Sequence, residues 1–382
     1  MSDRMFVNRA GATRRMRVVA VTGVAGKTTT AWLTAAVMSE AGLRVGIVSD
    51  LGCVAADGGL HAAPDRERPG AIPDWIARLE ADGCTHAVVE VHPAALAAGA
   101  LGRDSCAVVV VSGAARGPRS ADHARRIAAA IAPGGCLVAT GVPGLGGIAS
   151  AVARRGGRTC LTAGLDAGCD VHARPVERSL HGQTFLASAA GQVVPVAVDV
   201  PVASYARNAM AAAAAGLCLG VPLDLAARGI EAAGGVAGRV ERLDRGQEFA
   251  AFLDAPPCRH ALASTLASLR RLTAGRLAVV AERRLVDAIG AAEFARPVRR
   301  TCDDVVVVPS DVLDDEAGGE AVAAYARVDR VLGRLGAGDC LIALGDSAGP
   351  RTGSGVPVAT LVDGWLRLAH PPRRFATGPR AA

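Results

Sequence analysis

The fold of this chain is decided by one stretch near its start, Val18-Val19-Ala20-Val21-Thr22-Gly23-Val24-Ala25-Gly26-Lys27-Thr28-Thr29-Thr30. A short apolar run ends in a turn that contains glycine, and an apolar-periodic segment follows the Lys-Thr-Thr triplet. This pattern predicts a strand, a phosphate-binding loop and the start of a helix. Glycines let the backbone amides turn inward around phosphate oxygens, and the helix adds the positive end of its dipole to the same anion site. The stretch therefore predicts a nucleotide-binding domain.

The residue types in this loop predict how ATP and Mg²⁺ would be held. Lys27 is expected to reach the β- and γ-phosphates, and the Thr28 hydroxyl is expected to bind Mg²⁺. Of the 42 lysine and arginine residues Lys27 is the only lysine, and a compact ammonium suits a phosphate here better than a rigid guanidinium. The alternative is a glycine-rich turn with an incidental lysine, and Val21 departs from the general pattern, which has glycine there. The loop residues predicted to contact the nucleotide are Gly23, Gly26, Lys27, Thr28 and Thr29.

The composition sets the size and the partners that we expect. With 382 residues the chain is long enough for two domains with their own cores, and its 3% aromatic content predicts cores made of aliphatic side chains. The formal net charge is +6, but the arginines are scattered and form no basic block interleaved with aromatics. We therefore predict no nucleic-acid binding, while anionic substrates remain compatible.

Cysteine spacing and hydropathy bear on the compartment. The ten cysteines show no metal-ligand or Cys-x-x-Cys spacing, which favours buried small side chains in a reducing compartment. Residues 1–17 are polar and arginine-rich, unlike a signal peptide, and no apolar stretch approaches membrane length. We therefore expect a cytoplasmic protein without membrane insertion.

Strands and helices alternate after the loop. Apolar runs predict strands at 45–49, 86–91, 106–111, 136–140 and 159–162, and the segments between them predict helices at 30–41, 72–82, 121–132 and 148–155. Residues 52–70 are expected to form a loop or hairpin. Such alternation predicts an α/β fold with a P-loop-type, mostly parallel sheet that helices cover on both faces.

The pattern changes near residue 170. Short alternating segments over 170–200 predict an antiparallel extension, and helices are expected at 203–219 and 223–233. The glycine-rich segment 234–238 reads as a linker. A second series of strands and helices follows, with strands expected at 248–254, 276–281, 304–308 and 340–344 and helices at 260–272 and 321–335. This series predicts a smaller Rossmann-like α/β domain. The expected division is an N-terminal tail 1–17, a central ATP-binding domain 18–238, a C-terminal domain 239–369 and a disordered tail 370–382.

Four stretches in order resemble the Mur ligase family, and most closely its UDP-N-acetylmuramoyl-tripeptide synthetase branch. Residues 22–29 resemble the family loop T-G-T-N-G-K-T-T, and 89–91 resemble the strand whose terminal acid binds Mg²⁺. Residues 205–209 resemble the segment whose second asparagine contacts adenine, here Asn208. Residues 238–243 resemble the G-R-x-E motif that opens the C-terminal domain, and Asp254 stands where that domain supplies an acid to the nucleotide ribose.

The chain also departs from this family. Only some sixteen residues precede the first strand, so the N-terminal domain that holds the UDP-sugar is expected to be missing. His92 stands two positions early for the family's metal-binding histidine. The family motifs T-N…D-H, D-Y-A-H-x-P and D-N-P-R read differently here, at 112–117, 254–257 and 310–313. The carbamoylated second lysine that bridges metal ions in many members has no counterpart, because Lys27 is the only lysine.

Each candidate site residue has a functional and a structural interpretation. Glu90 at a strand end is a metal ligand or half of an ion pair, and His92 is a metal ligand or a polar surface residue. Asn208 contacts the nucleotide or lies on a solvated helix face. Arg239 clamps a phosphate or is a surface arginine, and Asp254 binds the ribose or forms a turn.

The resemblance implies an ADP-forming amide ligase that uses ATP and Mg²⁺, with Lys27 and Glu90 as catalytic residues and Thr28, Glu90 and His92 on the metal. A carboxylate substrate would become an acyl phosphate and an amine would capture it. A UDP-muramoyl peptide is the acid that the resemblance suggests, with a protein partner for the missing N-terminal function. The alternative is a catalytically degenerate nucleotide-binding relative with a regulatory or partner-subunit role. A P-loop ATPase or kinase of another class ranks last.

Overall fold

The computed structural model describes residues 16–55, 57–61, 70–112, 120–140, 145–309, 318–345 and 358–370. It divides into two compact units, Met1–Val236 and Ala237–Ala382. Several expectations lie outside the described residues: the tail over residues 1–15, the motif segments 113–117 and 310–313, and the tail from residue 371. The two units are described separately below.

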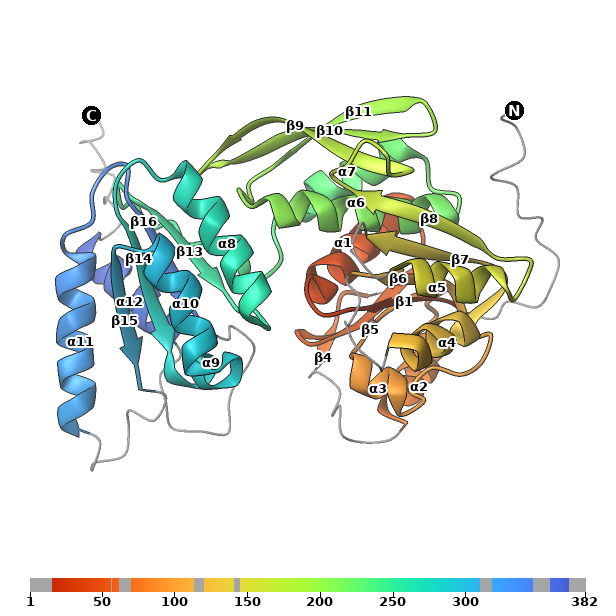
Figure 1. The fold of residues 1–382 in the computed structure, drawn as a ribbon, viewed down its shortest axis with the longest axis horizontal. Coiled ribbons are helices and arrows are strands. Elements are labelled where there is room, and N and C mark those ends of the chain that lie inside the picture. The colour runs from red at the N-terminus through yellow and green to blue at the C-terminus, as the bar shows by residue number, and fades with distance from the viewer. Residues whose placement is uncertain are drawn as a thin grey trace, which may run out of the picture. The chain divides into compact units, whose positions relative to one another are not determined.

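The first unit is built on a large sheet with β1 (Arg17–Thr22) near its middle (Figure 1). The strand order is β11-β10-β9-β8-β7-β6-β1-β5-β2-β3-β4. The strands from β2 to β8 in this order run parallel, and they are β2 (Val45–Ser49), β5 (His86–Val91), β1, β6 (Cys106–Val111), β7 (Ile131–Thr140) and β8 (Thr159–Gly164). Their valine-rich sequences suit strands buried on both faces. The mostly parallel sheet predicted from the sequence is confirmed.

Antiparallel strands extend this sheet on both sides. On one side β9 (Val171–Ser179) continues parallel from β8, and β10 (Gly182–Ala189) and β11 (Gln192–Val198) then run antiparallel to their neighbours. Alternate residues of β10 are buried, as expected for a sheet covered on one face. On the other side the short strands β3 (Gly52–Val54) and β4 (Leu60–His61) form a hairpin after β2. Both antiparallel segments agree with the sequence prediction.

Three helices pack together on the phosphate-loop face of the sheet. They are α1 (Lys27–Glu40), α6 (Ala203–Cys218) and α7 (Leu223–Ala233), and Figure 1 shows them beneath β9, β10 and β11. The approach of α6 and α7 to α1 depends on glycine, because a Cβ on Gly216 or Gly229 would lie 2.6 or 2.7 Å from atoms of Val37. The position of the loop before α1 is therefore tied to the packing of α6 and α7.

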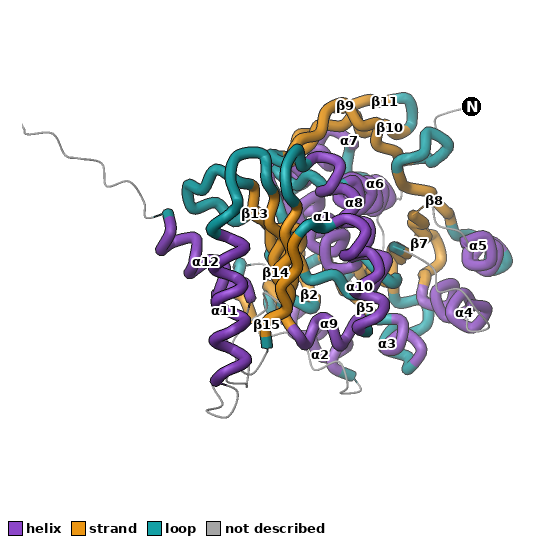
Figure 2. The backbone as a smooth tube through the Cα atoms, turned by 60° about the vertical axis from the view of Figure 1, so that its left-hand side comes forward, coloured by secondary structure: helices purple, strands orange, loops and turns teal. Residues whose placement is uncertain are grey.

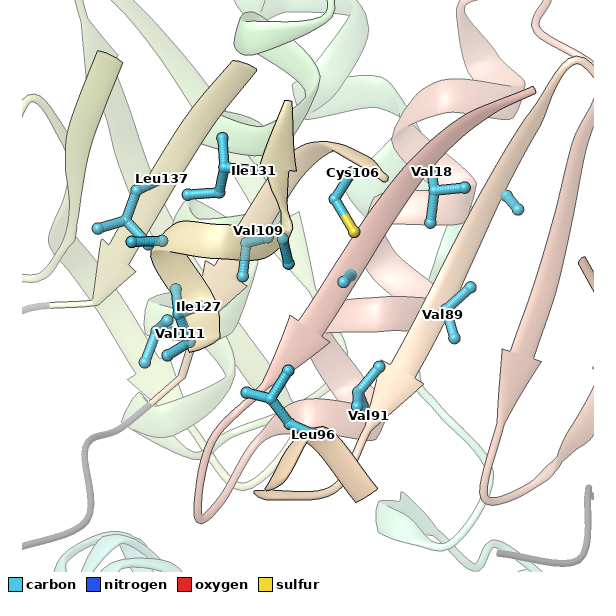
Figure 3. Packing of buried hydrophobic residues seen from close by; sticks show 14 of the residues in the cluster. Val18, Val89, Val91, Leu96, Cys106, Val109, Val111, Ile127, Ile131 and Leu137 are labelled. Carbon is cyan, nitrogen blue, oxygen red and sulfur yellow. The ribbon is translucent and has the colours of Figure 1, made fainter. Parts of the chain in front are cut away.

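The opposite face of the sheet is covered by α2 (Ala71–Ala81), α3 (Pro93–Ala97), α4 (Ser120–Ala130) and α5 (Leu145–Ala153). Figure 3 shows Val89, Val91 and Val109 from the strands packed with Leu96 of α3 and Ile127 of α4. The expected helix over 121–132 ends at Ala130, because Ile131 already pairs with Cys106 at the start of β7. The stop residues of the sequence, Pro133 and Gly134, stand after this point and inside β7.

The second unit contains a five-stranded sheet in the order β12-β13-β16-β14-β15. The strands are β12 (Arg239–Arg242), β13 (Ala250–Asp254), β14 (Leu277–Glu282), β15 (Asp304–Val308) and β16 (Cys340–Leu344), all parallel except β12. Figure 2 shows α11 (Gly318–Leu332) and α12 (Val358–Ala369) on one side of these strands, with α8 (Arg259–Leu272) and α10 (Ala291–Thr301) on the other. The short helix α9 (Arg283–Ile289) follows β14. The predicted α/β class of this region is confirmed, whereas α9, α10 and α12 were not expected.

Candidate functional site

The phosphate loop lies at the carboxyl end of β1, between that strand and α1. Gly26 has a φ of 79°, in the left-handed region, and its carbonyl accepts a hydrogen bond from the Thr30 N–H at 2.9 Å, which starts the helix. Gly23 has a φ of 138°, another conformation that residues with side chains rarely adopt. The two glycines of the sequence motif therefore stand where the backbone needs them.

Lys27, Thr28 and Glu90 form the buried centre of the site. Glu90 lies near the carboxyl end of β5, the parallel neighbour of β1, where residue 90 pairs with residue 21. The Thr28 hydroxyl donates to Glu90 Oε1 at 3.1 Å, and Lys27 Nζ lies 3.8 Å from the same oxygen. The side chains of Lys27 and Glu90 are 6% and 0% exposed. The structure thus places Glu90 of β5 beside the two loop residues, as expected for parts of one site.

Asp50 joins this centre although the sequence analysis did not single it out. It directly follows β2, and its backbone N–H donates to Glu90 Oε2 at 3.1 Å. Nε2 of His92 lies 3.1 Å from both carboxylate oxygens of Asp50. The sequence signal for Asp50 was its position directly after an apolar strand, where open α/β sheets place ligand contacts. A lone acid in a loop with no motif around it gave too little reason to choose it.

The electrostatics of the site favour a bound cation. Burial raises the pKa of Glu90, the nearby Asp50 carboxylate raises it further, and the Lys27 ammonium opposes both effects. Two acids therefore face one lysine in a setting where unpaired charge is costly. Ligand atoms of Asp50, Glu90 and His92 lie within 4.8 Å of one another, and the Thr28 hydroxyl adjoins them. This set of donors fits a divalent cation beside a bound phosphate.

Asn208 lies against the phosphate loop. A Cβ placed on Gly26 would lie 2.5 Å from Asn208 Oδ1, so the amide of α6 packs directly on the loop backbone. The helix is also fixed at its start, where the Tyr205 hydroxyl donates to the Gly234 carbonyl at 2.6 Å. Asn208 therefore does not lie on a face of α6 remote from the loop, and its contact with a nucleotide stays a prediction.

Arg239 and Asp254 belong to the second unit. Asp254 ends β13 and is 5% exposed, and its carboxylate accepts hydrogen bonds from the Val240 N–H, the Ala255 N–H and the Thr265 hydroxyl at 3.3, 3.0 and 3.1 Å. Burial raises the pKa of Asp254, while Arg239 and these hydrogen bonds oppose the rise. The carboxylate thus holds β12, β13 and α8 together. The nucleotide contacts expected of Arg239 and Asp254 stay predictions.

The known proteins that this chain is similar to are named as ligases and synthases. No family model matches the chain. Among curated proteins, UDP-N-acetylmuramoyl-L-alanyl-D-glutamate–2,6-diaminopimelate ligase of Corynebacterium glutamicum is 30% identical over 274 residues, and its counterpart in Corynebacterium efficiens is 28% identical over 292 residues. These matches cover 69% and 70% of this chain. The chain spans about half of each relative, namely 52% of its length.

Solved structures share the fold. A UDP-N-acetylmuramoyl-L-alanyl-D-glutamate–2,6-diaminopimelate ligase superposes with a TM-score of 0.67 at 18% identity, covering 93% of this chain and 79% of that one. MurF ligase from Thermotoga maritima in complex with ADP gives a TM-score of 0.66 at 16% identity, covering 93% and 81%. Folylpolyglutamate synthase from the same organism gives a TM-score of 0.65 at 14% identity, covering 94% of this chain and 90% of that one.

Among the described helices, none combines the length and the apolar character that a membrane span requires.

Proposed function

We propose that this chain, a relative of the Mur ligases, is an ATP-dependent ligase that joins a carboxylic acid to an amine and releases ADP and phosphate. Its curated relatives are named as ligases of UDP-N-acetylmuramoyl-L-alanyl-D-glutamate and 2,6-diaminopimelate, and one structural neighbour is a complex with ADP. The single observation that carries the proposal is the buried centre of Lys27, Thr28 and Glu90 at the end of the phosphate loop.

Each residue of this centre has a task in phosphoryl transfer. Lys27 would neutralise charge on the β- and γ-phosphates, and the loop amides after Gly23 and Gly26 would orient them. Thr28 and Glu90 would hold Mg²⁺, with His92 as the third ligand of the sequence prediction. When bound, the metal ion neutralises phosphate charge and polarises the phosphoryl group.

The chemical steps follow from this arrangement. An oxygen of the substrate carboxylate attacks the γ-phosphorus, the bond to the β-phosphate oxygen breaks, and ADP leaves. The substrate amine then attacks the acyl carbon, loses a proton and expels phosphate, which leaves the amide. The protein contributes position and charge neutralisation.

The nucleotide contacts outside the loop belong to the same proposal. Asn208 would contact the adenine, which its position against Gly26 supports. Arg239 and Asp254 of the second unit would contact the phosphates and ribose, as the family resemblance implies. The acid substrate would be a UDP-muramoyl peptide and the amine an amino acid, since these are the substrates that the relatives' names print. A partner protein would supply UDP-sugar recognition.

A second function is favoured by a specific observation. Lys27 is the only lysine and lies in the phosphate loop, so the chain has no lysine to carbamoylate as a metal bridge. A nucleotide-binding protein that does not turn over ATP, acting as a regulator or partner subunit, is consistent with this composition.

The deciding experiment measures phosphate release from ATP and Mg²⁺ in the presence of amino acids and UDP-muramoyl peptides, singly and in pairs. A ligase releases phosphate only when both an acid and an amine are present. Lys27→Ala is expected to abolish ATP binding and turnover, whereas Arg174→Ala, on the exposed side of β9, should leave both unchanged. Tight ATP binding without turnover in every mixture would favour the regulatory function. Normal activity of Lys27→Ala would remove the phosphate-loop assignment altogether.

A further inference from the structure

Two cysteines from distant parts of the chain meet where helix α6 packs on the sheet. Cys136 lies in β7, opposite Thr159 of β8, and Cys218 is the last residue of α6. The helix packs against both strands, and the two thiols form a hydrogen bond with each other. Tertiary packing therefore pairs two thiols that no spacing in the sequence connects.

Small side chains along α6 bring the two sulfur atoms together. Over residues 211–216 the helix has an unbroken run of buried small residues, five alanines followed by a glycine. The absence of longer side chains in this run allows the helix to lie close to the sheet, so a cysteine in its last turn reaches a cysteine on the strand. Cys136 is 4% exposed, whereas Cys218 is only partly buried. A small oxidant can therefore approach the pair from the side of Cys218.

The surroundings of Cys136 favour its thiolate. The hydrogen bond that the Cys218 thiol donates lowers the pKa of Cys136, and the Thr159 side chain and the Leu161 N–H act in the same direction. Burial and the Asp170 carboxylate oppose this effect. The same contact raises the pKa of Cys218, so the shared proton stays on the donor. Because the thiolate is the reactive form, Cys136 is the nucleophile of the pair and Cys218 is the thiol that resolves it.

A third cysteine nearby is placed differently. Cys160 of β8 is opposite Leu137, one position beyond the pair formed by Cys136 and Thr159. Successive residues of a strand point to opposite faces of the sheet, so Cys160 lies on the face away from Cys136. It is therefore a matched control for the pair.

We propose that Cys136 and Cys218 are a redox modification site, which hydrogen peroxide or an organic hydroperoxide oxidises to a disulfide. The inference is independent of the proposed function, because it involves neither ATP nor the phosphate loop. Reversible disulfides of this kind also occur in reducing compartments. The alternative is a pair of packed thiols that stays reduced.

The oxidation with hydrogen peroxide proceeds in two steps. The Cys136 thiolate attacks one peroxide oxygen, the O–O bond breaks, and the departing hydroxide becomes water with the proton that Cys136 had released. The Cys218 sulfur then attacks the sulfur of the resulting sulfenic acid, and its proton leaves with the hydroxyl group as a second water. Each disulfide consumes one peroxide, and a dithiol reductant restores both thiols.

Peptide mapping tests the pairing. The full chain is reduced, freed of reductant and treated with hydrogen peroxide, and the remaining thiols are blocked with N-ethylmaleimide. Cleavage after arginine leaves Cys136 as the only cysteine of peptide 127–154 and Cys218 as the only cysteine of peptide 208–228. We expect mass spectrometry of the unreduced digest to show these two peptides joined, and dithiothreitol to separate them. The intact chain should lose two of its ten titratable thiols.

Variants separate the proposed chemistry from mere packing. Cys218→Ser should prevent the disulfide and leave Cys136 as a sulfenic acid that dimedone traps, whereas Cys136→Ser should give neither product. Cys160→Ser should form the disulfide as the wild type does. Melting temperatures of the reduced variants show that each is folded. A chain whose two peptides stay separate after peroxide treatment, or a disulfide that joins Cys160 instead, would overturn the inference.

The thermal stability gives a second readout. The disulfide closes a long loop between β7 and the end of α6, so the oxidised wild type should melt about 5–10 °C higher than the reduced protein. Cys218→Ser should show no such rise after the same treatment. Lys27→Ala should form the disulfide as the wild type does, since its ammonium takes no part in the thiol chemistry. Failure of the ligase assay would therefore leave this inference standing, and failure of the peptide mapping would leave the ligase proposal standing.

Discussion

Glu90 and Asp254 are two buried acids in similar places with different surroundings. Each lies at or next to the carboxyl end of a parallel strand, and each is 5% exposed. Asp254 accepts three hydrogen bonds within its own unit and has Arg239 as its countercharge. Glu90 accepts two, and the charges that act on it are the Asp50 carboxylate and the Lys27 ammonium.

The different charges around Glu90 and Asp254 show which feature distinguishes a buried acid that can bind a cation. Burial is equal in the two cases and raises both pKa values. The distinguishing feature is the second carboxylate beside Glu90, because two neighbouring acids repel each other until a cation or proton joins them. Asp254 has three donors, and among the described residues no second carboxylate acts on it. We therefore expect metal-dependent turnover to depend more on Glu90 and stability to depend more on Asp254.

The largest effect should come from Glu90→Gln. The amide oxygen can accept from the Thr28 hydroxyl or from the Asp50 N–H, and the loss of charge removes the repulsion from the Asp50 carboxylate, so the unfolding free energy should change little. Metal-dependent turnover should fall at least about 100-fold, as for the loss of other charge-stabilising groups. Phosphate release and denaturant unfolding measure the two quantities. A Glu90→Gln variant that loses stability but keeps full turnover per folded molecule would contradict the functional role of this acid.

Asp254→Asn should lower the unfolding free energy more than Glu90→Gln does. The amide oxygen can still accept from the Val240 and Ala255 N–H groups and its NH2 can donate to the Thr265 hydroxyl, but the charge that faces Arg239 is lost, which lowers the unfolding free energy by about 1–2 kcal/mol. Hydrogen exchange of the β13 amides should speed up correspondingly. Asp287→Asn, an exposed acid on α9, is the control and should change stability little. Unchanged protection of β13 in Asp254→Asn would contradict a structural role for this acid.

Gly26→Ala tests how the loop is held on the Glu90 side. The residue has a φ of 79°, and the new Cβ would meet Asn208 Oδ1 at 2.5 Å. We expect a loss of about 2 kcal/mol in unfolding free energy, together with weaker ATP binding. Adding Asn208→Ala should recover part of the stability by removing the contact. Gly147→Ala, where a Cβ meets open space on α5, should cost nothing.

The smallest effect concerns the other end of β5. His86 is 8% exposed, and burial together with Arg17 lowers its pKa to about 4 from 6.5. The folded state then binds fewer protons than the unfolded state between these values, so stability falls as pH drops. From pH 6.5 to pH 5 this loss should be about 1.5 kcal/mol. His86→Gln should flatten the wild-type slope by that amount in denaturant titrations, and His172→Gln should not.

Local sequence was enough to predict much of the fold and part of the site. The loop, the strand carrying Glu90 and the antiparallel extension each have a pattern within one segment, and the structure has these elements. Asp50 was missed because its role depends on strand pairing between β2 and β5, which no local pattern states. The contacts of Asp254 depend in the same way on β12 and on Thr265 of α8.

The missed helices have physical reasons as well. The helix α10 contains Pro297, which weakens a helix prediction from sequence. The strand starts at Ile131, two residues before the stop residue Pro133, and its pairing with Cys106 decides this position. Pairing over long sequence distances thus accounts for what the sequence left undecided.

The solitary lysine also makes the phosphate loop chemically addressable. Lys27 is the one side-chain amine in 382 residues, and its side chain is 6% exposed. Apart from the α-amine, an amine-selective acylating reagent therefore has a single amine to modify, and the mass of the peptide that contains Lys27 reports on this loop. A nucleotide that covers the amine would slow the labelling, so the rate of adduct formation would measure occupancy without a radioactive or fluorescent ligand.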